Sequence, residues 1–168
     1  AEAVAKIRET MAAAAKPQAA TRQGAPLRRL KTRTVEEVRY SADLPIDLFG
    51  ENHVQELVEK TDANAYNGKP GHFIGHLQTN KVNKVVGRAA LIQSVDSTRL
   101  WIRSMPPRPV WLVQDILVEI NIGEEASKSG VDADSLFPLL GAARQGDIRL
   151  RGLMASRPPI ADDTETPL

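Results

Sequence analysis

Short apolar segments alternate with amphipathic ones along this chain, and this alternation most limits its possible folds. Six segments have the pattern of β-strands, and helical patterns lie between them. Successive strands are about 20 to 30 residues apart, which is typical of parallel βαβ units. An open, doubly wound sheet and a (β/α)8 barrel both begin in this way, and no internal repeat distinguishes them. The predicted strands cover residues 27–32, 46–49, 73–74, 89–95, 111–122 and 147–154.

The segments between the strands also contain helix-start signals. Apolar residues at three- and four-residue spacing predict a first helix over residues 1–16. Thr34 is placed to cap the next helix, with Glu36 and Glu37 in the first turn, where acidic side chains are favoured. Further helices are predicted around residues 54–58 and 82–86, after Asp96 and Ser97, and over residues 132–143.

Composition limits the functions that fit. The chain has 168 residues, which suit a single domain over 1–168, and 42% of them are hydrophobic and 26% charged. A net charge of +1 provides no strong field for nucleic acid or an anionic membrane, and no apolar run is long enough to cross a bilayer. Cysteine is absent, which excludes disulfides and thiolate chemistry and fits a reducing compartment such as the cytoplasm.

Polar side chains follow the predicted strands at the points where the strands end. They are most concentrated in residues 72–81, where a short apolar strand meets Gly75 and then a polar helix start. The carboxyl ends of parallel strands lie along one rim, so one ligand can contact several of them. The residues placed there are Lys31, Glu51, Asn52, His72, His76, Ser94, Asp96, Ser97, Asn121 and residues 124–128 and 152–154.

Lys31 has the most specific chemistry of this group. A lysine held on a strand and partly removed from water loses proton affinity, and nearby Arg29 or Arg33 would act in the same direction. A neutral amine can condense with an aldehyde to form an imine. Spacing alone favours another interpretation, in which Lys31 and the two arginines form a solvated basic edge.

The histidines and Lys128 carry less specific signals. His72 and His76 could form a metal-binding pair, but no third ligand is evident, so a structural role or a place beside a ring-shaped ligand fits better. Lys128 shares its loop with two glutamates, as a surface lysine commonly does. No glycine-rich dinucleotide motif, phosphate-binding P-loop or His-Glu-x-x-His zinc pattern is present.

Five segments together resemble one protein family. In family order they are FGENHVQEL (49–57), HFIGHLQTNKV (72–82), IQSVDS (92–97), NIGEEASKSG (121–130) and RGLMA (151–155). They are similar to the pyridoxal phosphate homeostasis proteins, which are single-domain relatives of the alanine racemase barrel. The resemblance extends over most of residues 31–160.

This resemblance implies an α/β fold of the (β/α)8 barrel type that carries pyridoxal 5′-phosphate as a lysine aldimine without substrate turnover. Lys31, followed by Thr32, matches the family's cofactor lysine. Asn52 and His72 match residues near the cofactor, and Lys128 matches a lysine near the ligand entrance. We expect a cytoplasmic monomer that binds neither nucleic acid nor membranes and whose partners are apo-enzymes that accept the cofactor.

Three features depart from the family pattern. Arg29 lies two residues before Lys31, where the family strand is apolar and small, and strand alternation would direct its side chain into the barrel at a high desolvation cost. Gly71 replaces a tryptophan that usually precedes the histidine. The family continues with two more strands and helices that hold the phosphate, so the sequence predicts an incomplete barrel that lacks the last two βα units.

Two other functions remain open at this level. An amino-acid racemase would need a second acid–base residue opposite the imine, commonly a tyrosine, and only Tyr40 and Tyr66 are present. A non-catalytic βα scaffold that binds a protein partner would leave Lys31 exposed and far from Asn52 and His72.

Overall fold

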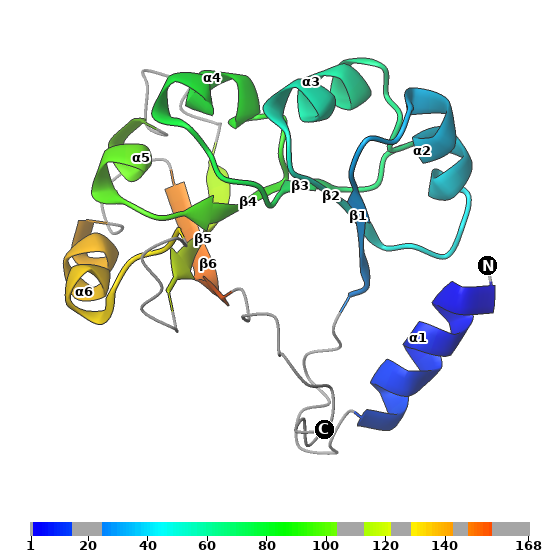
Figure 1. The fold of residues 1–168 in the computed structure, drawn as a ribbon, viewed down its shortest axis with the longest axis horizontal. Helices are drawn as coiled ribbons and strands as arrows, with labels where there is room; N and C mark the ends of the chain where they lie inside the picture. Colours follow the sequence, from blue (N-terminus) through cyan, green and yellow to red (C-terminus); the bar gives the residue numbers. More distant parts are fainter. Residues whose placement is uncertain (1, 15–24, 104–112, 122–128, 143–147, 156–168) are drawn as a thin grey trace.

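Six parallel strands with helices between them make up the fold (Figure 1). The computed structural model describes residues 2–14, 25–103, 113–121, 129–142 and 148–155. The strands lie side by side in the order of the sequence, and each connection passes through a helix to the neighbouring strand. They are β1 (Leu27–Leu30), β2 (Leu48–Glu51), β3 (Gly71–Phe73), β4 (Leu91–Val95), β5 (Gln114–Ile120) and β6 (Ile148–Ala155). The alternation predicted from the sequence is confirmed.

Helices cover one side of the curved sheet. They are α1 (Glu2–Ala14), α2 (Val35–Ala42), α3 (Val54–Asp62), a 3-10 turn η2 (Thr79–Lys81), α4 (Val82–Val85), α5 (Thr98–Arg103) and α6 (Ala133–Ala142). The helices from α2 to α6 line the outer side of the sheet, whereas α1 lies apart from this layer (Figure 1). Arg8 attaches α1 to the loop before β2, because its guanidinium donates to the Pro45 carbonyl and pairs with Asp47.

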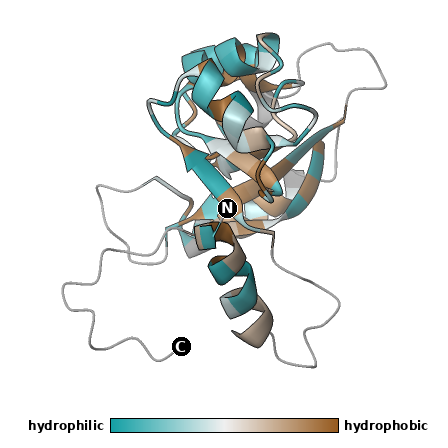
Figure 2. Ribbon diagram, turned by 90° about the vertical axis from the view of Figure 1, so that its right-hand side faces the viewer, coloured by the Kyte–Doolittle hydropathy of each residue, from teal (hydrophilic) through white to brown (hydrophobic). Residues whose placement is uncertain are grey.

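Alternate strand residues fill the space between the sheet and the helices. Phe49, Phe73, Ile92 and Ile116 come from four adjacent strands, and each is 0% exposed. Leu57 of α3 belongs to the same buried cluster. Hydrophobic residues are concentrated along the strands, and hydrophilic ones on the outer surface of the helices (Figure 2). The other, concave face of the sheet therefore carries the side chains that alternate with this core.

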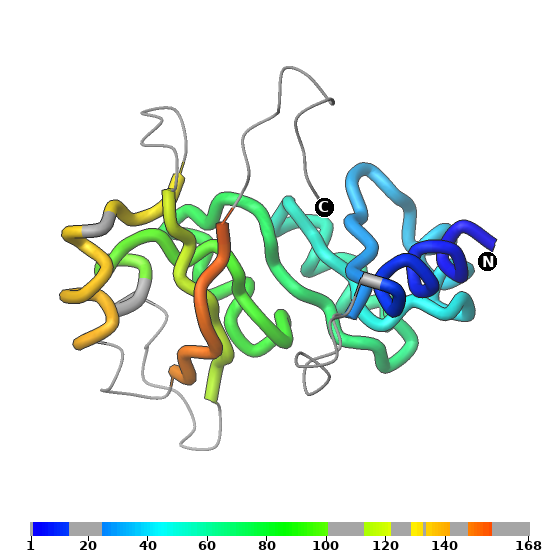
Figure 3. Tube along the Cα trace, turned by 90° about the horizontal axis from the view of Figure 1, so that it is seen from below, coloured from blue at the N-terminus to red at the C-terminus, as the bar shows by residue number. Residues whose placement is uncertain are grey.

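The sheet has two edges among the described residues. β1 pairs only with β2, and β6 pairs only with β5, within the part of the chain that the structure describes. Seen from below, α1 lies at the β1 end of the molecule, far from β5 and β6 (Figure 3). Within the described ranges, no helix combines the length and apolar character that crossing a membrane requires.

Gly50 lies inside β2, one residue beyond the strand predicted over 46–49. A Cβ atom on Gly50 would lie 2.6 Å from Leu27 Cδ2 and 2.9 Å from Ile74 Cδ1, so the glycine makes room for two side chains on the concave face. The predicted strand 46–49 was therefore displaced toward the N-terminus. Glu51 is the last residue of β2 rather than part of a turn.

Two other predicted strands were placed incorrectly, and those over 89–95 and 111–122 were longer than β4 (Leu91–Val95) and β5 (Gln114–Ile120). The prediction of 27–32 was too long, because the chain turns after Leu30 and Thr32 adopts a left-handed conformation with φ 57°. The prediction of 73–74 was shifted, because the strand begins at Gly71 and ends at Phe73.

Thr34 caps α2 as predicted. Its hydroxyl accepts from the Glu37 backbone N–H at 3.3 Å, and the Glu37 carboxylate accepts from the Thr34 N–H at 2.8 Å, which completes a capping box. We expect Thr34→Ala to lower the free energy of unfolding by about 1 kcal/mol. Thr10→Ala is the matched control, because Thr10 lies inside α1 and alanine is the better helix former there. Equal midpoints for wild type and Thr34→Ala in urea unfolding would contradict the prediction.

Candidate functional site

The register of the first three strands puts three of the predicted site residues in or directly after neighbouring strands. Leu30 pairs with Glu51, so Lys31 and Asn52 each follow the same rung of the ladder. Gly50 pairs with His72, which lies one rung lower. Alternation within β3 puts His72 on the face opposite the helices, because its neighbour Phe73 is buried on the helix side, whereas Lys31 and Asn52 are the first residues after β1 and β2.

Lys31 is exposed and lies just beyond β1. The Thr32 hydroxyl donates to the Lys31 carbonyl at 2.7 Å within the turn that follows. The sequence predicted a Lys31 side chain that is partly removed from water, but in this structure the side chain is exposed to solvent. Arg29 is also exposed, so the cost of burying an unpaired arginine does not arise.

Asn52 is held by the turn after β3. The Ile74 N–H donates to the Glu51 carbonyl at 2.9 Å, immediately before Asn52. A Cβ atom on Gly75 would lie only 2.0 Å from the Asn52 carbonyl oxygen, so this approach requires glycine. The side-chain oxygen Oδ1 of Asn52 is buried and has no hydrogen-bond partner among the described residues. A buried acceptor of this kind is suited to a donor on a ligand.

His72 is half-buried on β3, where it pairs with Gly50 of β2. Its Nδ1 lies 2.9 Å from Nε2 of Gln93 on β4, and the amide can donate to this nitrogen when the imidazole is neutral. Burial lowers the pKa of His72 below its ordinary value, which favours the neutral ring. His72 therefore offers a fixed, uncharged ring on the concave face. Lys128, the fourth predicted site residue, lies outside the described residues.

Beneath Asn52, on the helix side, lies a buried polar cluster that the sequence analysis missed. Glu51 is 0% exposed and Lys60 of α3 is 1% exposed, and their charged groups are 2.9 Å apart. The Lys60 amine also contacts Glu56 at 2.8 Å, and the Tyr66 hydroxyl lies 3.1 Å from Glu51. Glu51 occurs two residues after Phe49 on the buried face of β2, and this spacing was the available signal for its burial.

This cluster is electrostatically unusual. Burial raises the pKa of Glu51 above its ordinary value, while Lys60 and Tyr66 act in the opposite direction. Burial and the nearby Glu51 carboxylate raise the pKa of Tyr66, so the phenol stays protonated and can donate. The Tyr66 ring stacks on Phe49 with centroids 5.5 Å apart. A Cβ atom on Gly71 would lie 2.9 Å from this ring, so the tyrosine needs a glycine at position 71.

A second group of polar residues lies at the ends of β3, β4 and β5. His76 Nδ1 is 3.6 Å from the Asp96 carboxylate and 3.1 Å from the Ser129 hydroxyl. Burial and the neighbouring Asp96 charge raise the pKa of Glu119. No three His, Cys, Asp or Glu side chains in the described ranges are arranged to hold a metal ion.

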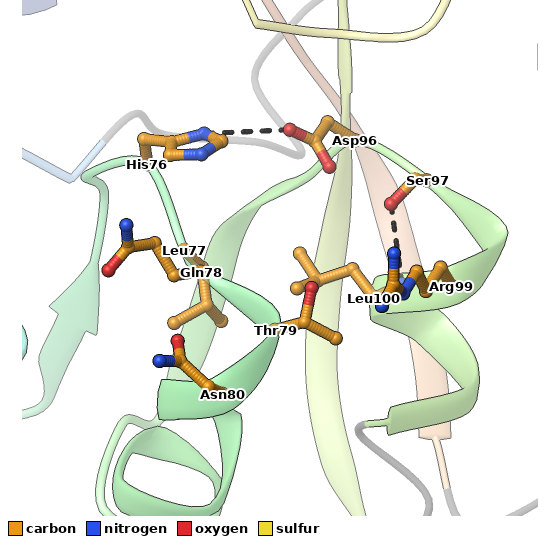
Figure 4. A pocket seen from close by; sticks show the side chains of 9 residues that line it. All are labelled: His76, Leu77, Gln78, Thr79, Asn80, Asp96, Ser97, Arg99 and Leu100. Atoms are coloured by element: carbon orange, nitrogen blue, oxygen red, sulfur yellow. Dashed lines mark hydrogen bonds and ion pairs between the residues drawn. The ribbon is translucent and has the colours of Figure 1, made fainter.

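Below the His76–Asp96 contact is a cavity of about 450 Å³. Figure 4 shows His76 and Asp96 on one side of it, with Thr79 and Leu100 opposite. Ser97 accepts a hydrogen bond from the Leu100 backbone N–H at 3.3 Å, as expected from the capping signal in the sequence. The lining residues do not include Lys31, Asn52 or His72, so none of these three side chains faces this cavity.

Comparison with known proteins identifies the family. No protein-family model matches the chain. The chain is 35% identical over 167 residues to the pyridoxal phosphate homeostasis protein of Pseudomonas aeruginosa, and the match covers 96% of this chain and 72% of that protein. The chain belongs to the pyridoxal phosphate homeostasis protein family. Against the family member from Aquifex aeolicus, identity is 35% over 138 residues, with 80% of this chain and 60% of that protein covered.

Several solved structures have a similar fold. An unknown protein from Bifidobacterium adolescentis aligns with a TM-score of 0.72 at 27% identity, over 96% of this chain and 70% of that one. PipY of Synechococcus elongatus, solved without pyridoxal phosphate, gives 0.66 at 26% identity, over 86% and 71%. Alanine racemase from Corynebacterium glutamicum gives 0.62 at 13% identity, over 78% and 39%, which is a likeness of fold alone.

Proposed function

We propose that this chain takes part in pyridoxal phosphate homeostasis by holding the cofactor on its concave face through Lys31, without turning over a substrate. Its curated relatives are named for that role. PipY, which shares the fold, has also been solved with pyridoxal phosphate bound. Because the chain spans 60% of the length of the Aquifex relative, the activity of a whole family member is transferred to it only as a proposal.

The observation that best supports the proposal is the placement of Lys31 and Asn52 beyond the same Leu30–Glu51 rung. The buried, unpartnered Asn52 Oδ1 suits a ligand that carries a hydroxyl donor, as pyridoxal phosphate does. Neutral His72 lies one rung lower and can contact a ring without adding charge. The exposure of Lys31 fits the scaffold alternative. The pairing of Leu30 with Glu51, the residues directly before Lys31 and Asn52, does not fit it.

When bound, pyridoxal phosphate supplies an aldehyde that condenses reversibly with a neutral amine, with loss of one water. In this proposal Lys31 presents the amine, Asn52 and His72 orient the ligand, and Lys128 lies near its entrance. The partners are apo-enzymes that accept the cofactor. We further propose that β1 to β6 are the first six strands of an eight-stranded barrel, whose last two βα units would hold the phosphate. The fold likeness to alanine racemase supports this architecture.

The test measures cofactor attachment to the purified chain. After pyridoxal phosphate is added, the wild type should show the absorbance band of a lysine-linked cofactor, and Lys31→Ala should abolish it. Lys84→Ala is the control, because Lys84 is an exposed lysine on α4, on the outer side. After borohydride reduction, mass spectrometry should locate the cofactor on Lys31. An unchanged band in Lys31→Ala, or attachment at another lysine, would overturn the assignment.

The same protein sample separates the proposal from its alternatives. Racemisation of alanine by the loaded wild type would replace the proposal with an enzymatic function. No absorbance band at all in the wild type would favour a scaffold that binds a protein partner. We expect a band and no racemisation.

A further inference from the structure

We infer that Glu51, Lys60 and Tyr66 are positioning residues that hold Asn52 in place for the ligand on the concave face. The inference builds on the proposed function, since the ligand is the one proposed there. It adds three side chains that lie on the opposite face of the sheet and cannot contact that ligand themselves.

The first step is the direction of the two neighbouring side chains. Glu51 ends β2 with its side chain buried on the helix side, and Asn52 is the next residue on the same backbone. Any rotation of the backbone at this strand end moves both residues. Fixing the Glu51 carboxylate therefore fixes the direction in which the Asn52 amide leaves the sheet.

The second step is how firmly the carboxylate is fixed. Lys60 Nζ lies 2.9 Å from one oxygen of Glu51 and 3.2 Å from the other. The Tyr66 hydroxyl adds a third contact at 3.1 Å. All three side chains are at most 6% exposed, so water does not compete for these bonds. The ring of Tyr66 is itself held by stacking on Phe49 and by its close approach to Gly71.

The third step concerns the contacts that β3 and its turn make with the backbone of residues 51–52. The Ile74 N–H donates to the Glu51 carbonyl, and Gly75 lies directly against the Asn52 carbonyl. The backbone at residues 51–52 is thus held from the helix side by side chains and from the β3 side by backbone. A buried ion pair adds little net stability over apolar residues of similar volume. Its use here is to define one orientation for Asn52.

The experiment combines nuclear magnetic resonance of the full chain with pyridoxal phosphate titration. Tyr66→Phe removes only the hydroxyl and keeps the ring, while Glu51→Gln with Lys60→Met removes both charges together. We expect the Asn52 side-chain amide resonances to shift in both variants. The dissociation constant for pyridoxal phosphate should rise about threefold in the first and about tenfold or more in the second, as for other supporting hydrogen bonds behind a binding group.

The control is Lys69→Met. The Lys69 amine donates to the Leu44 carbonyl at 2.7 Å, away from the strand end that carries Asn52. This variant also loses a lysine hydrogen bond, but it should leave the Asn52 resonances and the dissociation constant unchanged. A role limited to stability would instead lower the unfolding midpoints of all the variants and leave Asn52 and the affinity unmoved. That result would overturn the inference.

Failure of the proposed function would be seen separately. If the wild type shows no saturable binding of pyridoxal phosphate, the proposed function fails. The positioning role is then decided by the Asn52 amide resonances. Resonances that move in Tyr66→Phe but not in Lys69→Met would support it, and resonances that stay at their wild-type positions in both variants would overturn it.

Discussion

Lys60→Met should lower the free energy of unfolding by about 3–5 kcal/mol at pH 7, because it leaves the fully buried Glu51 carboxylate without its charged partner. Methionine has a similar length and fills the space, so the loss arises from the uncompensated charge rather than from a cavity. Urea unfolding followed by circular dichroism measures the change. Glu56 also loses a contact, but its side chain is 20% exposed and can bind water instead.

The size of this loss should depend on pH. Burial already raises the pKa of Glu51 in the folded protein, and Lys60 acts against that rise, so its removal raises the pKa further. A carboxyl group with a raised folded-state pKa favours folding below its ordinary pKa and loses that contribution as the pH rises through the raised value. The difference between Lys60→Met and wild type should therefore be largest at neutral pH and smaller near about pH 4.

The paired variant Glu51→Gln with Lys60→Met provides the control for charge. Removing both charges should recover most of the lost stability, because a buried pair contributes little over a neutral replacement of similar volume. A loss below about 1 kcal/mol in Lys60→Met at pH 7 would show that water reaches Glu51. The same conclusion would follow if the loss did not change between the two pH values.

The strand–helix order was predictable because it depends on local patterns. Apolar spacing located all six strands, and Thr34 with Glu37 forms a capping box within four residues. Strand boundaries were less predictable, because they depend on residues far apart in the chain. Gly50 resembles a turn residue in the sequence, but its place in β2 follows from the close packing of Leu27 and Ile74.

The candidate site was predictable only where it depends on the order of the strands. The rule that parallel strands share a carboxyl rim predicted Asn52 and His72 at the ends of neighbouring strands. In the structure Asn52 follows β2, but His72 is the middle residue of β3 and pairs with Gly50. The buried cluster was not predicted, since Lys60 and Glu56 have the spacing of an ordinary solvated pair on a helix. Lys60 is buried because its amine pairs with Glu51, which belongs to β2 and lies outside the sequence pattern of helix α3. Likewise, the departure at Gly71 became understandable only once Tyr66 was found against it.

Gly75→Ala should be about as damaging as the loss of Lys60, with a decrease in the free energy of unfolding of about 3 kcal/mol or more. The added Cβ would lie 2.0 Å from the Asn52 carbonyl oxygen, and the next nearest atoms are also Asn52 backbone. A flexible side chain could rotate away from such a clash, but a backbone carbonyl next to the last rung of β2 cannot. The turn after β3 must therefore move away from Asn52, which also breaks the alignment of the concave site.

Gly141→Ala is the matched control for this substitution. Gly141 lies in α6 and a Cβ there would meet no atom of the described residues within 4 Å, so alanine should be neutral or stabilise the helix by up to about 1 kcal/mol. Urea unfolding of both variants gives the comparison, and pyridoxal phosphate titration at a temperature where Gly75→Ala is folded gives the effect on the site. A free energy of unfolding for Gly75→Ala within about 1 kcal/mol of the wild-type value would contradict the prediction. It would mean that the turn after β3 is not packed against Asn52 and that the ends of β2 and β3 do not hold each other in place.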